Sequence, residues 1–79
     1  MPSVRDILNE LKWRDNSEFN NVEVWYRHRG APNDTMVISG EEIVSLHKSF
    51  LETKTTMIPY HRVIKVTYEG RILFDRFEM

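Results

Sequence analysis

The sequence has 79 residues, a formal net charge of -1 and no cysteine. A chain of this length forms one domain with a small core. The absence of cysteine excludes disulfides and thiolate zinc sites, and it fits a reducing, cytoplasmic setting. The near-zero charge excludes a strongly basic nucleic-acid-binding domain, so any site for a polyanion must be a local patch. No apolar run approaches the roughly 18 residues of a membrane span, so we expect no membrane contact.

The first predicted element is a helix from about Val4 to Lys12. Ser3 and Asp6 resemble a capping box that would start it. Its apolar positions recur at helical spacing, as Val4, Ile7, Leu8 and Leu11. Trp13 falls opposite this stripe, so we expect the helix to end near it and the indole to pack elsewhere, as a lid on the core. Stacking on a base is the alternative for Trp13, and Trp25 has the same two interpretations.

Strand patterns follow the helix. Residues 22–29 alternate, with Val22, Val24, Tyr26 and His28 on one face. The string G-A-P-N-D ends this strand, and residues 35–39 predict a second one. Ser39 and Glu42 form a capping box, which favours a short helix from about Gly40 that gives way to a strand over residues 49–53. The spacing within residues 43–50 also permits a strand there.

The last third of the chain predicts a long strand over residues 58–68 and its antiparallel partner. Glu69 and Gly70 form the turn between them, with glycine at a position of positive φ. The resulting fold class is α+β, with the N-terminal helix packed on a mostly antiparallel, meander-like sheet of about five strands and a possible second short helix.

Pro59 interrupts the long predicted strand just before Tyr60, His61 and Arg62. Proline cannot donate to a sheet ladder, so it favours a strand edge or a bulge. The apolar pattern also changes register near Arg62. We therefore predict a bulge that makes His61 and Arg62 project from the sheet.

Two clusters share one composition: residues 26–29 read Tyr-Arg-His-Arg, and residues 60–62 read Tyr-His-Arg. Arginine binds phosphate oxygens with two parallel donors, histidine titrates near neutral pH, and tyrosine offers a stacking face. A single-stranded nucleic-acid end needs this set of groups. Such residues on a half-exposed sheet are also common without any function, and the composition alone leaves both readings open.

Three strings give the sequence a resemblance to a known family. They are R-G-A-P at residues 29–32, I-P-Y-H-R at residues 58–62, and G-x-x-L-F-D-R at residues 70–76. In this order and spacing they resemble the small, mainly archaeal proteins long catalogued as an uncharacterised family and later proposed to be an RNA cyclic-group end recognition domain. The resemblance covers nearly the whole chain, which predicts one domain over residues 1–79.

The resemblance implies Arg29, His61 and Arg62 as groups that bind the RNA end. It implies that other motif residues shape the backbone, namely Gly30, Pro32 and Pro59. The domain it points to is similar to modules fused to RNA-repair enzymes.

The leading hypothesis is a non-enzymatic module that binds phosphorylated or 2′,3′-cyclic-phosphate RNA 3′ ends and serves an RNA-processing or repair enzyme. Arg29 and Arg62 would hold phosphate oxygens, His61 would donate a hydrogen bond, and Tyr60 or Tyr26 would stack the terminal base.

Two rival functions stay open. One is a small ribonuclease or cyclic phosphodiesterase that uses His28 and His61 as an acid–base pair. The other is a protein-interaction domain. Because the three histidines show no ligand spacing with carboxylates, we predict no metal and no cofactor.

Overall fold

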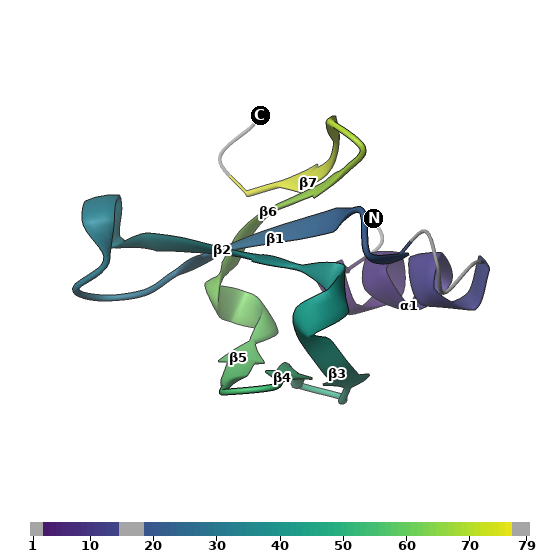
Figure 1. Ribbon diagram of the computed structural model, residues 1–79, viewed down its shortest axis with the longest axis horizontal. Coiled ribbons are helices and arrows are strands. Elements are labelled where there is room, and N and C mark those ends of the chain that lie inside the picture. Colours follow the sequence, from purple (N-terminus) through teal and green to yellow (C-terminus); the bar gives the residue numbers. More distant parts are fainter. Residues whose placement is uncertain (1–2, 15–18, 77–79) are drawn as a thin grey trace.

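The computed structural model describes residues 3–14 and 19–76 (Figure 1). Within this part of the chain, one α-helix is followed by seven strands in two antiparallel sheets. In chain order the elements are α1 (Val4–Arg14), β1 (Val22–Arg27), β2 (Thr35–Ser39), β3 (Ile43–Leu46), β4 (Phe50–Thr53), β5 (Met57–Pro59), β6 (Val63–Tyr68) and β7 (Arg71–Asp75). The α+β class is confirmed, but the prediction of one sheet with about five strands is wrong.

Helix α1 begins where the sequence predicts. The Asp6 amide donates to Ser3 Oγ at 3.2 Å, and the Ser3 amide donates to Asp6 Oδ2 at 3.3 Å, which closes the capping box. Leu8 is buried in the core. The helix continues to Arg14, and Trp13 is 89% exposed. The prediction that Trp13 packs as a lid is therefore wrong, because its position opposite the apolar stripe turns it to solvent. Part of the predicted connection, residues 15–18, lies outside the described residues.

The larger sheet has the strand order β2-β1-β6-β7. Strand β1 alternates as predicted: Val22, Val24 and Tyr26 are buried. Its other face carries Glu23, Trp25 and Arg27. Strands β6 and β7 form a hairpin whose turn has positive φ at both Glu69 (50°) and Gly70 (85°). Two left-handed residues match the twist of a two-residue hairpin, so the predicted turn is confirmed.

The smaller sheet has the order β3-β4-β5. The predicted second helix is only one 3-10 turn, Gly40–Glu42, and the chain then continues as strand β3. Its capping box is present, with the Ser39 amide 3.2 Å from Glu42 Oε2. A glycine is needed at position 40 because a Cβ there would collide with the backbone carbonyl of Phe19.

The predicted long strand over residues 58–68 is broken. Strand β5 pairs with β4 in the smaller sheet, whereas β6 pairs with β1 and β7 in the larger one. A 3-10 turn, Tyr60–Arg62, joins them (Figure 1). Pro59 thus marks the point where the chain passes from one sheet to the other, and not a bulge within one strand.

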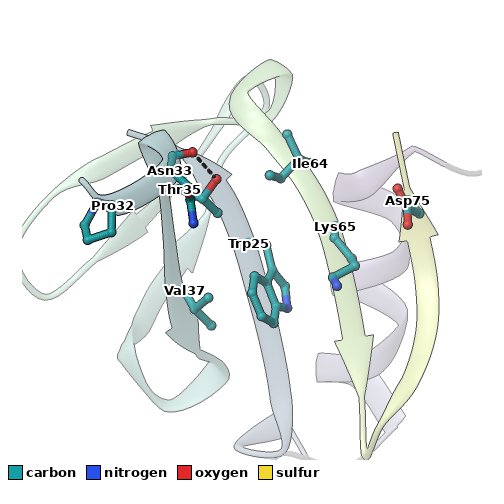
Figure 2. A pocket seen from close by; sticks show the side chains of 8 residues that line it. All are labelled: Trp25, Pro32, Asn33, Thr35, Val37, Ile64, Lys65 and Asp75. Carbon is teal, nitrogen blue, oxygen red and sulfur yellow. Dashed lines mark hydrogen bonds between the residues drawn. The ribbon is translucent and has the colours of Figure 1, made fainter. Parts of the chain in front are cut away.

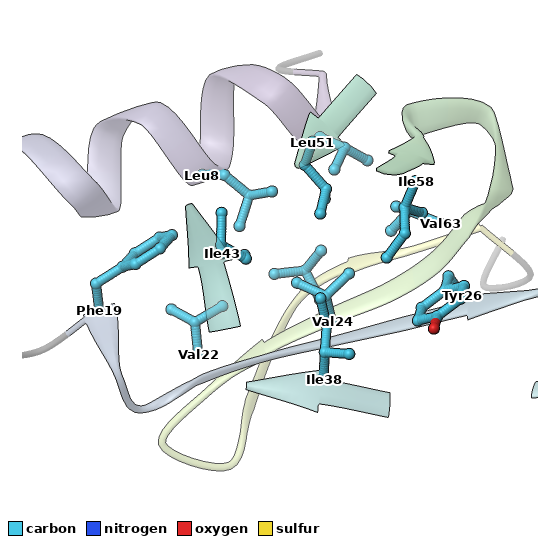
Figure 3. Close-up of a cluster of buried hydrophobic side chains, with 12 residues drawn as sticks. Leu8, Phe19, Val22, Val24, Tyr26, Ile38, Ile43, Leu51, Ile58 and Val63 are labelled. Atoms are coloured by element: carbon cyan, nitrogen blue, oxygen red, sulfur yellow. The ribbon is translucent and has the colours of Figure 1, made fainter. Parts of the chain in front are cut away.

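The core lies between the inner face of the larger sheet, the smaller sheet and α1 (Figure 3). Its buried members come from all three layers: Val4, Leu8, Phe19, Val22, Val24, Tyr26, Ile38, Ile43, Leu51, Ile58, Val63 and Val66. No helix in the described ranges is long and apolar enough to cross a membrane.

Candidate nucleic-acid interface

The 3-10 turn at Tyr60–Arg62 displays its side chains at the junction of the two sheets. Pro59 has an extended backbone (φ -61°, ψ 141°), and the Val63 amide closes the turn on the Tyr60 carbonyl. Arg76 fastens the turn from outside, because its Nε donates to the Val63 carbonyl at 3.0 Å and its Nη2 donates to the Tyr60 carbonyl at 3.4 Å. As a result, His61 and Arg62 are exposed on a backbone held at both ends.

A bulge does occur, two residues beyond Arg62. Trp25 is opposite Lys65, but Tyr26 is opposite Val63, so Ile64 is the extra residue of β6. The bulge explains the apolar pattern, because it allows Val63 and Val66 both to point into the core. It also leaves the half-buried Ile64 among the polar residues described below.

The loop between β1 and β2 places Arg29 at the end of the larger sheet. The His28 amide donates to the Asp34 carbonyl at 2.8 Å, and the Gly30 amide lies 3.4 Å from Asp34 Oδ1. Gly30 has φ 95°, a value that favours glycine. Pro32 begins a 3-10 turn here. Asp34 therefore organises the turn, and Arg29 is exposed beside it.

Five basic residues gather on and next to the outer face of the larger sheet, and we call them the arginine patch: Arg27, Arg29, His61, Arg62 and Arg76. Arg29 lines one surface cavity of about 440 Å³, and His61 and Arg62 line another of about 260 Å³ with Arg76. Arg27 and Ile64 line both cavities. The two cavities therefore adjoin, and the two arginines that the sequence predicts, Arg29 and Arg62, each share a cavity with Arg27.

A cleft with an aromatic floor continues from the arginine patch. Four of its residues form one cross-strand row over four neighbouring strands, because Val37 is opposite Trp25, Trp25 is opposite Lys65, and Lys65 is opposite Asp75. Figure 2 shows this row, with Ile64 at the end of the cleft nearest the β1–β2 loop. The cleft has a volume of about 540 Å³ and shares Asn33, Thr35 and Ile64 with the cavity of Arg29. We call it the Trp25 cleft.

The indole of Trp25 has two notable contacts. Lys65 Nζ lies 4.2 Å from the ring centroid, a cation–π contact worth about 0.5–1 kcal/mol at an exposed site. The indole Nε1–H is buried and has no hydrogen-bond partner among the described residues. A buried donor without a partner lowers the stability of a protein by about 1–3 kcal/mol, so such a group is unusual in a folded protein.

Both tyrosines of the two clusters pack into or against the core. Tyr26 is 6% exposed and belongs to the core. The Tyr60 hydroxyl donates to the His47 carbonyl at 2.7 Å, and its ring packs against the core cluster. Burial raises the pKa of both hydroxyls above the ordinary 10.0, so both are protonated at neutral pH. The assignment of Tyr26 as a base-stacking residue is corrected, because its ring belongs to the core. Tyr60 is half-buried, and its role in stacking stays a prediction.

The two histidines of the rival enzyme hypothesis open onto different cavities. His28 lines a cavity of about 320 Å³ with Met36, Met57 and Arg62, and its ring meets the edge of Tyr26 with centroids 6.1 Å apart. His61 lines another cavity, which also includes Arg62. Of the four cavities described here, none is lined by both histidines.

In residues 3–14 and 19–76, no group of three or more histidine, aspartate or glutamate side chains is placed to hold a metal ion.

Comparison with known proteins identifies the family. Residues 1–76 match the family described as the MJ1316 RNA cyclic group end recognition domain. The chain belongs to this family. Relatives of this MJ1316-type chain include a UPF0248 protein of Methanococcus vannielii. The two sequences are 31% identical, and the alignment covers 96% of this chain and 94% of the relative. A UPF0248 protein of Methanocaldococcus jannaschii is 31% identical, with 92% of each chain covered. No solved structure matches the chain.

Sequence reasoning assigned neither Arg76 nor Lys65 to the site of this MJ1316-type domain, and for Trp25 it left a base-stacking role and a place in the core both open. Arg76 ends the string G-x-x-L-F-D-R, which carried the resemblance, but nothing local indicates that it reaches the turn at residues 60–62. Trp25 and Lys65 lie 40 residues apart in sequence. Only the register of β1 against β6 brings them together.

Proposed function

We propose that the protein is a binding module for RNA 3′ ends that carry a terminal phosphate or a 2′,3′-cyclic phosphate. It would hold the end for an RNA-processing or repair enzyme. The observation that carries the proposal is the shared position of Arg27, between the cavity of Arg29 and the cavity of His61 and Arg62. Membership of a family named for RNA cyclic group end recognition supports the ligand class.

The chemistry of the arginine patch fits a terminal phosphate. Each guanidinium offers a planar fork of donors that matches two phosphate oxygens, and it keeps its charge at any physiological pH. Arg29 and Arg62 would approach the phosphate from two sides, with Arg27 between them. His61 would donate to a phosphate oxygen or to the ribose. Because the whole chain has a formal net charge of -1, attraction to RNA must come from this patch and not from the average charge.

Binding accounts for the arrangement better than catalysis does. A catalytic pair must have both histidines within reach of one phosphate. His28 and His61 line different cavities that have Arg62 in common, whereas three arginines line the adjoining space that the binding proposal uses. We therefore rank the histidine-based ribonuclease or phosphodiesterase second.

Titration of matched RNAs tests the proposal. Three short RNAs of one sequence would end in a 2′,3′-cyclic phosphate, a 3′-phosphate or a 3′-hydroxyl, and each mixture would also be assayed for cleavage. We expect the two phosphate-bearing ends to bind more tightly, and Arg62→Ala to weaken their binding about 5- to 150-fold, as for loss of a charge-assisted contact. Arg62→Lys should rescue poorly, because an ammonium lacks the fork.

The matched control is Arg71→Ala. Arg71 is also exposed and cationic, but it lines none of the four cavities. Equal affinity for all three RNAs, or equal effects of Arg62→Ala and Arg71→Ala, would refute recognition of the end. Cleavage by the wild type that is lost in His28→Ala and His61→Ala would favour the enzyme instead.

A further inference from the structure

We infer that the Trp25 cleft is the subsite for the base of the terminal nucleotide, and that the base stacks on the indole of Trp25. This inference rests on the proposed function, since it assumes that the arginine patch holds the end of an RNA chain. It adds a recognition element that is separate from the phosphate.

The cleft adjoins the arginine patch in a way that suits one nucleotide. Trp25 and Arg27 point to the same face of β1 and are two residues apart, a spacing of about 7 Å along a strand. The Trp25 cleft and the cavity of Arg29 share Asn33, Thr35 and Ile64, so there is no wall of core residues between them. A nucleotide whose phosphate lies at Arg27 and Arg29 can therefore place its base over Trp25.

The lining of the cleft matches a base better than it matches an apolar peptide. Its floor is an indole, and its sides include Val37, Pro32 and Ile64, which suit the flat face and edge of an aromatic ring (Figure 2). Lys65 and Asn33 add polar groups at the rim. A cationic track combined with an aromatic platform is the usual composition of a site for single-stranded nucleic acid.

Lys65 occupies the indole face in the free protein and would have to yield. Its ammonium lies 4.2 Å from the ring centroid at the end of a flexible four-carbon stem. An exposed cation–π contact stabilises less than a stacked base does, so exchange is favourable. The displaced ammonium stays beside the incoming nucleotide, where its charge still attracts phosphate.

The test compares two RNAs that differ only in the terminal base. Both end in a 2′,3′-cyclic phosphate, but in one the terminal ribose lacks its base. The sequence has two tryptophans, so Trp13→Phe leaves Trp25 as the single fluorescent reporter. Trp13 is exposed on α1 and takes no part in the cleft, so this substitution should leave binding unchanged. We expect the abasic RNA to bind about 5- to 150-fold more weakly, the effect of one stacked base, and only the complete RNA to quench Trp25.

Variants of Trp25 provide a second readout. Trp25→Leu should abolish the preference for the complete RNA but keep the dependence on Arg62, whereas Trp25→Phe should keep part of the preference because it retains an aromatic face. A thermal melt of each variant shows whether it folds, and the comparison of the two RNAs on the Trp13→Phe protein does not depend on that result.

Each outcome decides the matter. If both RNAs bind equally, depend on Arg62 and leave Trp25 fluorescence unchanged, recognition of the phosphate end stands and the base subsite is overturned. If neither RNA binds, the proposed function fails, and the inference fails with it.

Discussion

The guanidinium of Arg76 donates from Nε to the backbone carbonyl of Val63 at 3.0 Å, which joins the end of β7 to the first residue of β6. A second donor of the same side chain lies 3.4 Å from the carbonyl of Tyr60. Both acceptors are backbone atoms that flank His61 and Arg62. Arg76 therefore holds the turn that displays these two side chains, in addition to lining their cavity.

Arg76→Ala should destabilise the protein and weaken RNA binding together. It removes two hydrogen bonds from a charged donor, so we expect the free energy of unfolding to fall by about 1–3 kcal/mol, measured by urea denaturation. Arg76→Lys should recover little of the stability, because an ammonium lacks the planar set of donors that lets a guanidinium donate to both carbonyls. Arg71→Ala is the control, and a loss of stability as large as in Arg76→Ala would contradict the role of these two bonds.

Tyr60→Phe should reveal the hydroxyl's contribution to stability and its pH dependence. At pH 7 the variant should be less stable than wild type by about 0.5–1.5 kcal/mol, because the hydrogen bond to the His47 carbonyl is lost. Burial raises the pKa of Tyr60 in the folded state, while Arg5 acts against that shift.

The sign of the pH effect follows from this direction. A raised pKa in the folded state means that the contribution is fully present below the unfolded pKa of about 10 and is lost as pH rises through the folded pKa. The stability gap between wild type and Tyr60→Phe should therefore narrow above pH 10. Tyr26 is present in both proteins, so its titration cancels in the difference. If the difference in stability between wild type and Tyr60→Phe stayed constant through pH 11, the raised pKa of Tyr60 in the folded state would be contradicted.

The fold was predictable where local signals decide it. The capping box of Ser3 and Asp6, the alternation of β1 and the Glu69-Gly70 hairpin turn each depend on neighbours in sequence. For residues 43–46 the sequence favours a short helix but also permits a strand, because the apolar spacing fits both structures. Pairing of Leu46 with Leu51 in β4, a contact that local propensity does not encode, decides for a strand.

The site was predictable only in part, for a similar reason. The motifs indicated Arg29, His61 and Arg62, and all three are exposed around Arg27. The hydrogen bond from the Tyr60 hydroxyl to a carbonyl 13 residues away has no local signal in the sequence. The change of sheet after Pro59 depends on which strands pair with β5 and β6, and a single proline cannot specify this.

Gly40→Ala should be strongly destabilising. A methyl group at this position would collide with the backbone of Phe19, and backbone cannot move aside as a side chain can. We expect a loss of about 1–3 kcal/mol or more, as for overpacking in a core. The neighbouring Glu41→Ala is the control, because Glu41 is exposed. If Gly40→Ala melted at the wild-type temperature, the close approach of these two segments would be refuted.

The salt dependence of RNA binding should show whether the arginine patch contacts phosphate. For single strands the slope of log K against log salt changes by about 0.7 for each neutralised phosphate. Because Arg27, Arg29 and Arg62 surround one terminal phosphate, each of Arg27→Ala, Arg29→Ala and Arg62→Ala should reduce the slope by at most about 0.7, whereas Arg71→Ala should leave it unchanged. Slopes indistinguishable from wild type in all three patch variants would place the RNA on another surface.

A double-mutant cycle on Arg29 and Arg62 tests the central claim most directly, namely that the two arginines bind one terminal phosphate. Affinities of wild type, Arg29→Ala, Arg62→Ala and the double variant would be measured with cyclic-phosphate and hydroxyl-ended RNA. We predict a coupling energy of about 0.5 kcal/mol or more with the cyclic-phosphate end and none with the hydroxyl end. The reason is that the effects of two side chains that bind the same phosphate do not add. Additive effects within about 0.3–0.5 kcal/mol, equal for both RNAs, would contradict the claim.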